Sequence, residues 1–251
     1  MNLVQTSDAQ RGASQIQKWL DRSRCVVAFT GAGISTESGI PDFRSPGGVW
    51  SKYRTIYFDE FCASAEARQE YWCQKVEAHR DFARAEPNVV HQKLAVWESN
   101  GKLSGIITQN IDGLHQQAGS QRVQELHGTA RDVSCLDCEW RDRVDYWVGV
   151  FLETNQVPDC PECGGRLKHA TVSFGQALAS DVLDTAVEWA AQSDMFLALG
   201  SSLVVEPAAS LPRIAANQGA RLVIVNRDET PFDGIATLNV RAKLGDVFQR
   251  I

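Results

Sequence analysis

Two spacings of apolar residues alternate along the chain and predict two kinds of element. Short apolar stretches predict buried strands at Cys25–Phe29, Leu103–Thr108, Thr171–Phe174, Met195–Leu199 and Leu222–Val225. Apolar residues at helical spacing among polar ones predict helices over residues 8–22, 59–83, 89–98 and 180–191. Strands that alternate with helices favour an α/β fold with a doubly wound, Rossmann-like parallel sheet.

Four of the predicted strands run into small or polar residues. The residues that follow these strands include Gly31, Gln109, Gly200 and Asn226. Ligands of open α/β sheets bind outside the carboxyl ends of the strands. We therefore expect these strand ends to gather at one edge of the sheet and to form one nucleotide site.

Residues 129–170 differ from the rest of the chain, because they are rich in turns and show little helical period. We expect a single catalytic domain over residues 1–251, with an inserted smaller subdomain. The Rossmann-like part of the domain comprises residues 8–50, 100–128 and 171–251. Residues 51–99 form the helical insertion and residues 129–170 the zinc-binding module, for the reason given next.

Two cysteine pairs, Cys135-x2-Cys138 and Cys160-x2-Cys163, lie in this segment with 21 residues between them. Four thiolates at this spacing match a tetrahedral structural Zn²⁺ site. The alternative is two reduced or redox-active pairs. A closed site of four cysteines has no open position for water, so this zinc should stabilise its module and not do chemistry.

Composition excludes several classes of protein. The chain has 251 residues, 43% of them hydrophobic and 22% charged, which is typical of a soluble globular protein. No apolar stretch is long enough for a transmembrane helix, and the polar N-terminus does not resemble a secretory signal. The net charge of −6 gives no support for nucleic-acid binding. Seven cysteines, four of them paired by spacing, favour a reducing cytoplasm.

Two polar motifs follow the first and second predicted strands. The first, residues 31–44, reads GAGISTESGIPDFR, and a glycine-rich turn after a strand is a common way for backbone to approach a pyrophosphate. Its glycine spacing alone is equally typical of a plain tight turn. The second motif, residues 108–115, reads TQNIDGLH, and its Asn110 and Asp112 can either orient a ligand or cap a helix that begins near Ile111.

Among the five histidines, His127 is the candidate general base, because it follows another apolar stretch and imidazole titrates near neutrality. We expect His79 to be solvated and His91 to be structural. His115 should lie behind the residues that contact the ligand, and His169 has no evident role.

Together these motifs resemble the sirtuin family of NAD-dependent protein-lysine deacylases, from about Trp19 to Phe248. The resemblance implies that His127, with Leu126 and Gly128 around it, is the catalytic base, and that Asn110 and Asp112 are catalytic with it. It implies one NAD co-substrate and one structural Zn²⁺ per chain. The substrates would be acyl-lysine proteins, with no direct nucleic-acid or membrane partner.

The resemblance also implies roles for the residues around NAD. Phe43 would cover the nicotinamide end, Asp112 would bind the carboxamide, and Leu244 would be an adenine neighbour. Gln109 and Asn226 would contact ribose, Asn110 would contact ribose or water, and residues 200–202 would contact phosphate and ribose. The implied NAD-binding set is Gly31, Ala32, Gly33, Ser35, Pro41, Asp42, Phe43, Arg44, Gln109, Asn110, Ile111, Asp112, Gly200, Ser201, Ser202, Asn226, Arg227 and Leu244.

For the acyl-peptide, the resemblance implies binding by Tyr71 and by an edge strand made of Val172, Ser173, Phe174 and Gly175. Here the chain departs from the family, with Gln176 in place of a common Glu and Ser173 in place of an apolar residue. Sirtuins that prefer succinyl-lysine share a Tyr-x-x-Arg pair, whereas this chain has Tyr71 and Gln74. We therefore expect neutral acyl groups to be preferred, unless Lys75 takes the place of the arginine or Tyr71 is only a packing residue.

The reaction implied by the resemblance transfers the acyl group to ADP-ribose. The acyl oxygen attacks the anomeric carbon as nicotinamide leaves. His127 then draws a proton through the ribose hydroxyls, so that the 2′-oxygen can attack the imidate carbon and lysine can be released. The products are lysine, O-acyl-ADP-ribose and nicotinamide. Two alternatives are protein ADP-ribosyl transfer at the same NAD site and a non-catalytic NAD-sensing module.

Overall fold

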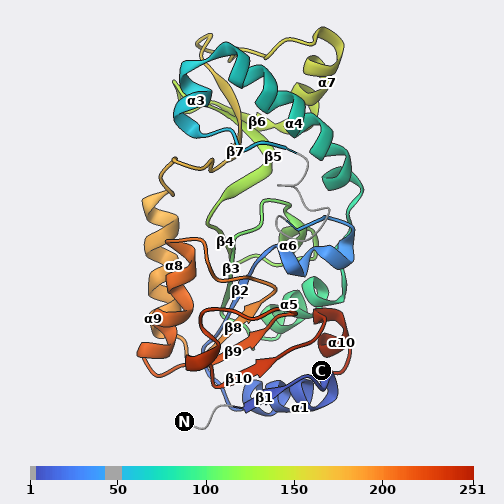
Figure 1. The fold of residues 1–251 in the computed structure, drawn as a ribbon, viewed down its shortest axis with the longest axis vertical. Coiled ribbons are helices and arrows are strands. Elements are labelled where there is room, and N and C mark those ends of the chain that lie inside the picture. Colours follow the sequence, from blue (N-terminus) through green and yellow to red (C-terminus); the bar gives the residue numbers. More distant parts are fainter. Residues whose placement is uncertain (1–3, 43–52) are drawn as a thin grey trace.

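The computed structural model describes residues 4–42 and 53–251, and Figure 1 shows two lobes stacked along the long axis of the molecule. The larger lobe is built on a seven-stranded sheet whose neighbouring strands are all parallel. Its strands, in spatial order, are β1 (Val4–Thr6), β10 (Leu238–Val240), β9 (Arg221–Val225), β8 (Met195–Leu199), β2 (Val26–Thr30), β3 (Gly105–Thr108) and β4 (Val123–Glu125). The predicted doubly wound parallel sheet is confirmed.

Helices cover both faces of this sheet, which is why its central strands are continuous apolar stretches. Every residue of β2, β3 and β8 is buried. Separate apolar clusters lie on the two faces. One face carries α1 (Ala9–Leu20), α5 (Val89–Ser99) and α10 (Leu244–Phe248), and the other carries α8 (Ser180–Gln192) and α9 (Leu211–Asn217) (Figure 1).

The expected helix over residues 59–83 is two helices. They are α3 (Phe58–Ala63) and α4 (Ala65–Arg84). Ser64 separates them, because its backbone is extended and its hydroxyl accepts from the N–H of Ala67 as the N-cap of α4. A serine within a helical pattern is therefore a start signal here.

The smaller lobe holds a three-stranded antiparallel sheet, in the order β6 (Arg141–Arg143), β5 (Gly128–Cys135), β7 (Leu167–Thr171). The strand expected at Thr171–Phe174 is displaced toward the N-terminus, because residues 167–171 pair with β5. Segment 129–170 also contains the helix α7 (Val144–Thr154), contrary to the weak helical period read from its sequence. Four of its residues are buried at helical spacing: Val144, Trp147, Val148 and Phe151.

The two halves of the smaller lobe share one apolar core, which joins residues of α3, α4 and α7 to the cysteine-bearing loops. Trp72 lies at its centre, fully buried and stacked on Phe151 with 5.7 Å between ring centroids. Within the described residues, no helix combines the length and the apolar character that crossing a membrane requires.

Short elements complete the large lobe near the sheet edge. They are α6 (Leu114–Gln117) and the 3-10 helices η1 (Ala32–Ile34), η2 (Thr36–Ser38), η3 (Ala208–Ser210) and η4 (Asp233–Ile235). Helix α6 begins at Leu114 and not near Ile111, directly after Gly113, which is in the left-handed conformation with φ 71°. The Asp112 carboxylate accepts from the N–H of Leu114, the first residue of this helix.

Candidate functional site

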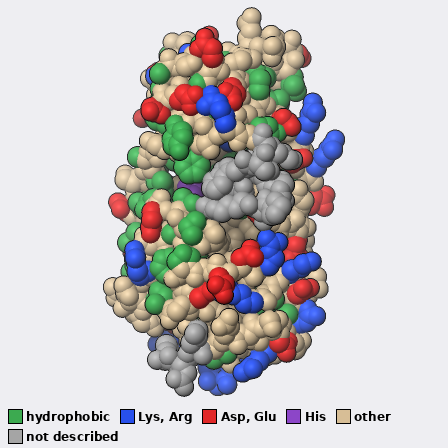
Figure 2. Space-filling model, in the orientation of Figure 1, with side chains coloured by type: hydrophobic (Ala, Val, Ile, Leu, Met, Phe, Trp, Pro, Cys, Tyr) green, Lys and Arg blue, Asp and Glu red, His purple; other side chains and the backbone are tan. Residues whose placement is uncertain are grey.

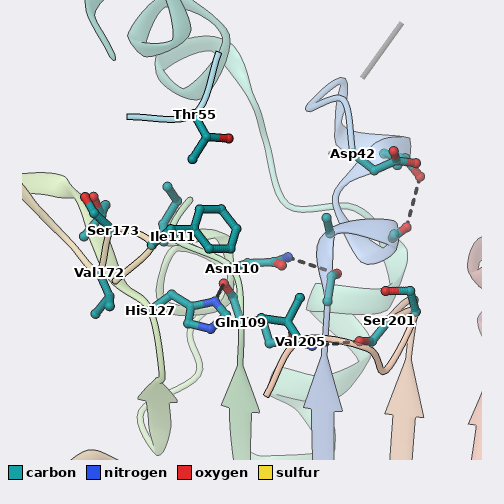
Figure 3. Close-up of a pocket in the computed structure, with 18 of the residues that line it drawn as sticks. Asp42, Thr55, Gln109, Asn110, Ile111, His127, Val172, Ser173, Ser201 and Val205 are labelled. Carbon is teal, nitrogen blue, oxygen red and sulfur yellow. Dashed lines mark hydrogen bonds between the residues drawn. The ribbon is translucent and has the colours of Figure 1, made fainter. Parts of the chain in front are cut away.

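A cleft of about 790 Å³ lies at the carboxyl edge of the parallel sheet and extends to the smaller lobe. Figure 2 shows hydrophobic side chains in a column beside the hollow at mid-height, and Figure 3 shows the cleft from within. Its lining includes residues that follow β2, β3, β8 and β9, so the predicted convergence of strand ends is confirmed.

Most residues expected around NAD line this cleft. The lining includes Gly31, Ala32, Gly33, Asp42, Gln109, Asn110, Ile111, Gly200, Ser201, Ser202, Asn226, Arg227 and Leu244. Ser35 and Asp112 are buried behind the wall, and Pro41 is not part of the lining. Phe43 and Arg44 lie outside the described residues.

The glycine-rich turn packs backbone against backbone. The N–H of Gly33 donates to the carbonyl oxygen of Gly200 over 2.8 Å, and a Cβ on Gly33 would lie only 2.8 Å from Gly200. The strand ends of β2 and β8 are thereby brought close enough for both to line the cleft.

A buried hydrogen-bond network orders the second motif behind the cleft wall. The Asn110 amide donates to the Gly31 carbonyl and to the Ser35 hydroxyl, each over 3.1 Å. Ser35 donates to one carboxylate oxygen of Asp112 over 2.7 Å, and the N–H of Leu114 donates to the other over 2.9 Å. The Asn110 side chain is thus fixed by β2 and η1, and Asp112 is fixed beside it.

His127 is oriented by backbone. Its Nδ1 lies 2.9 Å from the carbonyl oxygen of Gln109, and because a carbonyl can only accept, Nδ1 carries the proton. Nε2 is therefore the basic nitrogen, and the residue lines the cleft (Figure 3). Burial lowers the pKa of His127, against a smaller opposing effect of the hydrogen bond to Gln109. The imidazole is neutral at neutral pH and ready to take a proton.

The opposite wall is formed by the segment that follows β7. Tyr71 and residues 172–175, all expected to bind substrate, line the cleft. The N–H of Val172 donates to the carbonyl of His127 over 2.8 Å, and the N–H of Phe58 donates to the carbonyl of Phe174 over 2.9 Å. These bonds tie the segment to both lobes. Phe174 is 44% exposed beside Tyr57, which makes the rim of this wall apolar.

Several lining residues were not named from the sequence. They include Thr36, Glu37, Thr55, Ile56, Thr171, Leu178, Val205, Glu206, Asp228, Glu229 and Lys243. Most lie within a few residues of a predicted position, so nearness to the motifs was the only available signal. Thr55 and Ile56 enter from before α3, and nothing in their local sequence marks them as binding residues.

Gln74 and Lys75 both line the cleft, so the structure leaves both candidates for the arginine position in place. The Gln74 amide donates to the carbonyl of Arg54 and to Glu70. The Lys75 ammonium lies 5.3 Å from the centroid of the Tyr71 ring, and burial lowers its pKa to about 8. The Tyr71 hydroxyl lies 3.3 Å from the Thr171 hydroxyl.

The remaining histidines are buried to different degrees. The expectation that His79 is solvated is wrong, because it is only partly exposed and lies 3.3 Å from the Asp145 carboxylate. His91 is structural, since it forms a capping box with Asn88 at the start of α5. His169, for which the sequence suggested no role, packs against Trp72 with 4.9 Å between centroids.

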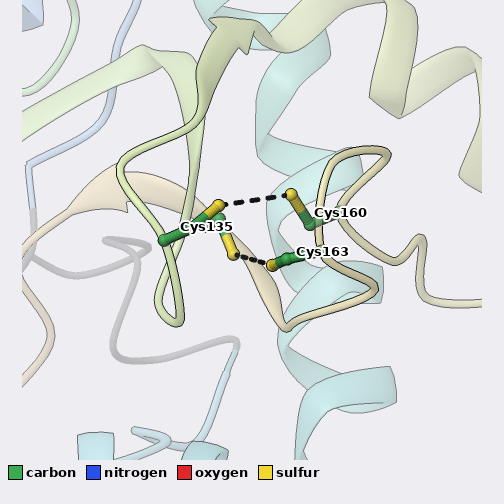
Figure 4. A group of neighbouring side chains, drawn as sticks. Cys135, Cys160 and Cys163 are labelled. Carbon is green, nitrogen blue, oxygen red and sulfur yellow. Dashed lines mark hydrogen bonds between the residues drawn. The ribbon is translucent and has the colours of Figure 1, made fainter.

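The four cysteines of the predicted zinc site come together at one end of the smaller lobe. Their sulfur atoms all lie within 4.8 Å of one another, with 3.5 Å between Cys135 and Cys163 and 3.7 Å between Cys138 and Cys160 (Figure 4). These separations are too long for disulfides. They fit a tetrahedron of Zn–S bonds of about 2.3 Å, whose edges are about 3.8 Å. None of the four lines the cleft, so a metal here is structural.

A sequence model of the Sir2 family matches residues 31–207. The chain is 46% identical over 237 residues to an NAD-dependent protein deacetylase of Rhodopseudomonas palustris, covering 94% of each protein. It is 42% identical to an NAD-dependent protein deacetylase of Thermotoga maritima, covering 92% of this chain and 94% of that protein.

Solved structures resemble the whole molecule. A structure described as a Sir2, p53 peptide and NAD⁺ complex matches with a TM-score of 0.87 and 40% identity, covering 94% of this chain and 95% of that one. One described as Sir2Tm bound to a propionylated peptide matches with a TM-score of 0.85 and 40% identity, covering 94% and 95%.

Proposed function

This chain belongs to the Sir2 family, and we propose that it is an NAD-dependent protein-lysine deacylase that yields nicotinamide and O-acyl-ADP-ribose. The observation that carries the proposal is the orientation of His127, whose Nδ1–H is held by the Gln109 carbonyl so that Nε2 serves as a base in the cleft. Relatives of over 40% identity that are NAD-dependent deacetylases support it.

The residues present fit NAD. Residues 31–33 and 200–202 bring glycine-rich backbone and the hydroxyls of Ser201 and Ser202 to the end of the cleft where phosphates would lie. Asn226 and Leu244 line the same end and would hold the adenosine. When bound, NAD supplies an electrophilic ribose carbon with a cationic leaving group, and so the reaction requires no catalytic metal.

The chain's own residues would then orient that ribose and move a proton. Asn110 lines the cleft, and Asp112 lies behind it with its carboxylate held by Ser35. Gln109 donates to the Ser201 hydroxyl over 2.7 Å and joins the two halves of the nucleotide site. Nε2 of His127 would accept the proton of a ribose hydroxyl.

We propose that an acyl-lysine peptide lies along residues 172–175 and adds backbone hydrogen bonds there. The apolar rim of Phe174 and Tyr57 would cover the lysine stem. The preference for neutral acyl groups stays a prediction, which depends on whether Gln74 or Lys75 meets the end of the acyl chain.

The four-cysteine cluster fits one structural Zn²⁺, which would join the loops around β5 and β7. We further propose a cytoplasmic setting, because four reduced thiolates at a metal site suit a reducing compartment. The negative net charge gives no support for direct nucleic-acid binding.

The experiment that tests the function is an assay of acetyl-lysine peptide with and without NAD, with mass analysis of all products. We expect free lysine and O-acetyl-ADP-ribose in equal amounts, formed only with NAD. ADP-ribose attached to protein, with the acetyl group retained, would instead establish ADP-ribosyl transfer. Absence of any turnover in protein that binds NAD would establish a sensing module.

A further inference from the structure

Two histidines outside the cleft, His91 and His115, are in contact behind the TQNIDG turn. Their ring centroids are 4.9 Å apart at an interplanar angle of 60°, and both side chains are at most 1% exposed. We call them the histidine pair. Both come from the large lobe, His91 from the first turn of α5 and His115 from α6.

The hydrogen bonds of the histidine pair fix the position of each ring proton. The N–H of Asn88 donates to Nδ1 of His91 over 3.4 Å, so the proton of His91 is on Nε2. Nε2 of His115 lies 2.9 Å from the Thr30 hydroxyl, whose own proton is donated to Thr108 over 2.8 Å. Nε2 of His115 is therefore the donor, and its Nδ1 is the acceptor.

The two ring nitrogens left over are complementary. Nε2 of His91 is a donor and Nδ1 of His115 is an acceptor, and neither atom has a hydrogen-bond partner among the described residues. Burial lowers the pKa of both histidines, to about 4 for His91, so both are neutral at pH 7. The two rings are therefore joined by packing alone, and the histidine pair links α5 to α6 without placing a charge in the core.

From His115 the hydrogen bonds lead to the candidate active site. His115 donates to Thr30 and Thr30 donates to Thr108. The Thr108 oxygen also accepts from the backbone N–H of Asn110 over 3.0 Å, and this is the residue whose amide lines the cleft. Each of these side chains is at least nine-tenths buried, so a broken link cannot be replaced by bulk water.

The histidine pair is also connected to the glycine-rich segment that contains η1 and η2, through Asn88. Asn88, which caps α5 and donates to His91, also donates to the Ile34 carbonyl over 2.8 Å and to the Ser38 hydroxyl over 2.9 Å. Segments η1 and η2 are thereby tied to the histidine pair. Asp112 accepts from Ser35 in that segment, and its negative charge partly opposes the lowering of the His91 pKa by burial.

We propose that His115, backed by His91, is a positioning residue that sets the nicotinamide end of the site through the chain Thr30, Thr108 and Asn110. This inference rests on the proposed function, in which Asn110 and Asp112 hold the nicotinamide riboside. Since the hydrogen-bond chain ends on Asn110 and not on residues 200–202 or 226, loosening it should disturb nicotinamide and leave the ADP-ribose end intact.

The test compares NAD with ADP-ribose, which lacks nicotinamide. We expect His115→Leu to weaken NAD affinity by about tenfold, as for a buried hydrogen bond left unmade, while ADP-ribose affinity stays within about twofold. Exchange of labelled nicotinamide into NAD should slow by at least the same factor. His115→Gln should restore most of both values, because its amide N–H reaches the position of Nε2.

Thr30→Val breaks the next link without altering either histidine, and so it guards against a folding defect of His115→Leu. It should reproduce the selective loss for NAD. His79→Gln, a half-buried histidine of the smaller lobe, is the matched control and should change neither affinity. A melting temperature well above the assay temperature shows that a variant is folded in the assay.

Two outcomes would overturn the inference. One is an equal loss of NAD and ADP-ribose affinity, which would make the histidine pair a support of the whole fold. The other is unchanged nicotinamide exchange in folded His115→Leu and Thr30→Val. A wild type that consumes no NAD would refute the proposed function instead, and the two affinities would still decide the role of the histidine pair.

Discussion

The two lobes carry different parts of the proposed reaction. The nucleotide side of the cleft is built from strand ends of a sheet buried on both faces, and its polar groups hydrogen-bond to one another through backbone. The acyl side is built from helix α4 and an irregular segment after β7, beside a lobe whose core includes Cys135 and Cys160 of the four-cysteine cluster. The nucleotide wall therefore suits one ligand of fixed shape, whereas the shape of the acyl wall depends on its side chains.

The largest expected effect on the nucleotide side is the loss of the base His127. Replacing His127 by Ala should lower deacylation by about 10²–10⁴-fold, the usual contribution of a general base, while NAD affinity and melting temperature change little. Steady-state assays with acetyl-peptide and a direct NAD-binding measurement check this. His79→Ala is the control for a histidine of the other lobe. Near-wild-type turnover of His127→Ala would refute the assigned base.

In the smaller lobe, the loss of a zinc ligand should lower stability. Cys135→Ser or Cys160→Ser should remove zinc and lower the melting temperature, because metal binding is coupled to folding of the module. Metal analysis of the wild type should give about one zinc per chain. Cys73→Ser, at an exposed cysteine of α4, is the matched control. Folded, active wild type that contains no zinc would contradict the site.

How much the sequence predicted also differs between the lobes. The sheet, the convergence of Gly31, Gln109, Gly200 and Asn226, and the four-cysteine cluster were predictable, because strand ends and ligand spacing are local properties. The sequence did not predict that the helix over residues 59–83 is divided at Ser64, nor did it predict helix α7. Helix α7 forms because Trp147 and Phe151 find a core made by α4, which no local pattern reveals.

Within the site, local sequence could identify residues but not which of them line the cleft and which lie behind its wall. Asp112 and Ser35 are in predicted motifs, yet both are buried behind the wall, and only the fold shows that one bonds the other. His115 and His91 are separated by 24 positions, so their contact depends on how α5 and α6 pack.

A pH profile sharpens the role of the nucleotide side. Burial lowers the pKa of His127 below its ordinary value of about 6.5, and the base must be neutral to accept a proton. We expect kcat/KM to be flat from that lowered pKa up to pH 8. Below it, the rate should fall about tenfold for each pH unit as the imidazole becomes protonated. A rate that rises on acidification would contradict a neutral base.

The smallest expected effect concerns the acyl side. Arginine gives a carboxylate a permanent charge and a bidentate partner, and Gln74 gives neither, so we expect kcat/KM on an acetyl-peptide to exceed that on its succinyl counterpart. Lys75 is a second side chain that could meet the acyl carboxylate, because it also lines the cleft, with its ammonium beside the Tyr71 ring. Burial lowers the pKa of Lys75 to about 8.

Two variants separate these side chains. Gln74→Arg should raise succinyl activity by up to about tenfold if Tyr71 and residue 74 meet the end of the acyl chain, and should leave acetyl activity unchanged. Lys75→Met keeps the aliphatic length and removes the charge. If the wild type already prefers succinyl-peptide and Lys75→Met abolishes that preference, the expectation drawn from Gln74 is wrong and the carboxylate contact belongs to Lys75. If neither variant alters the ratio, α4 faces away from the acyl chain and Tyr71 only packs the wall.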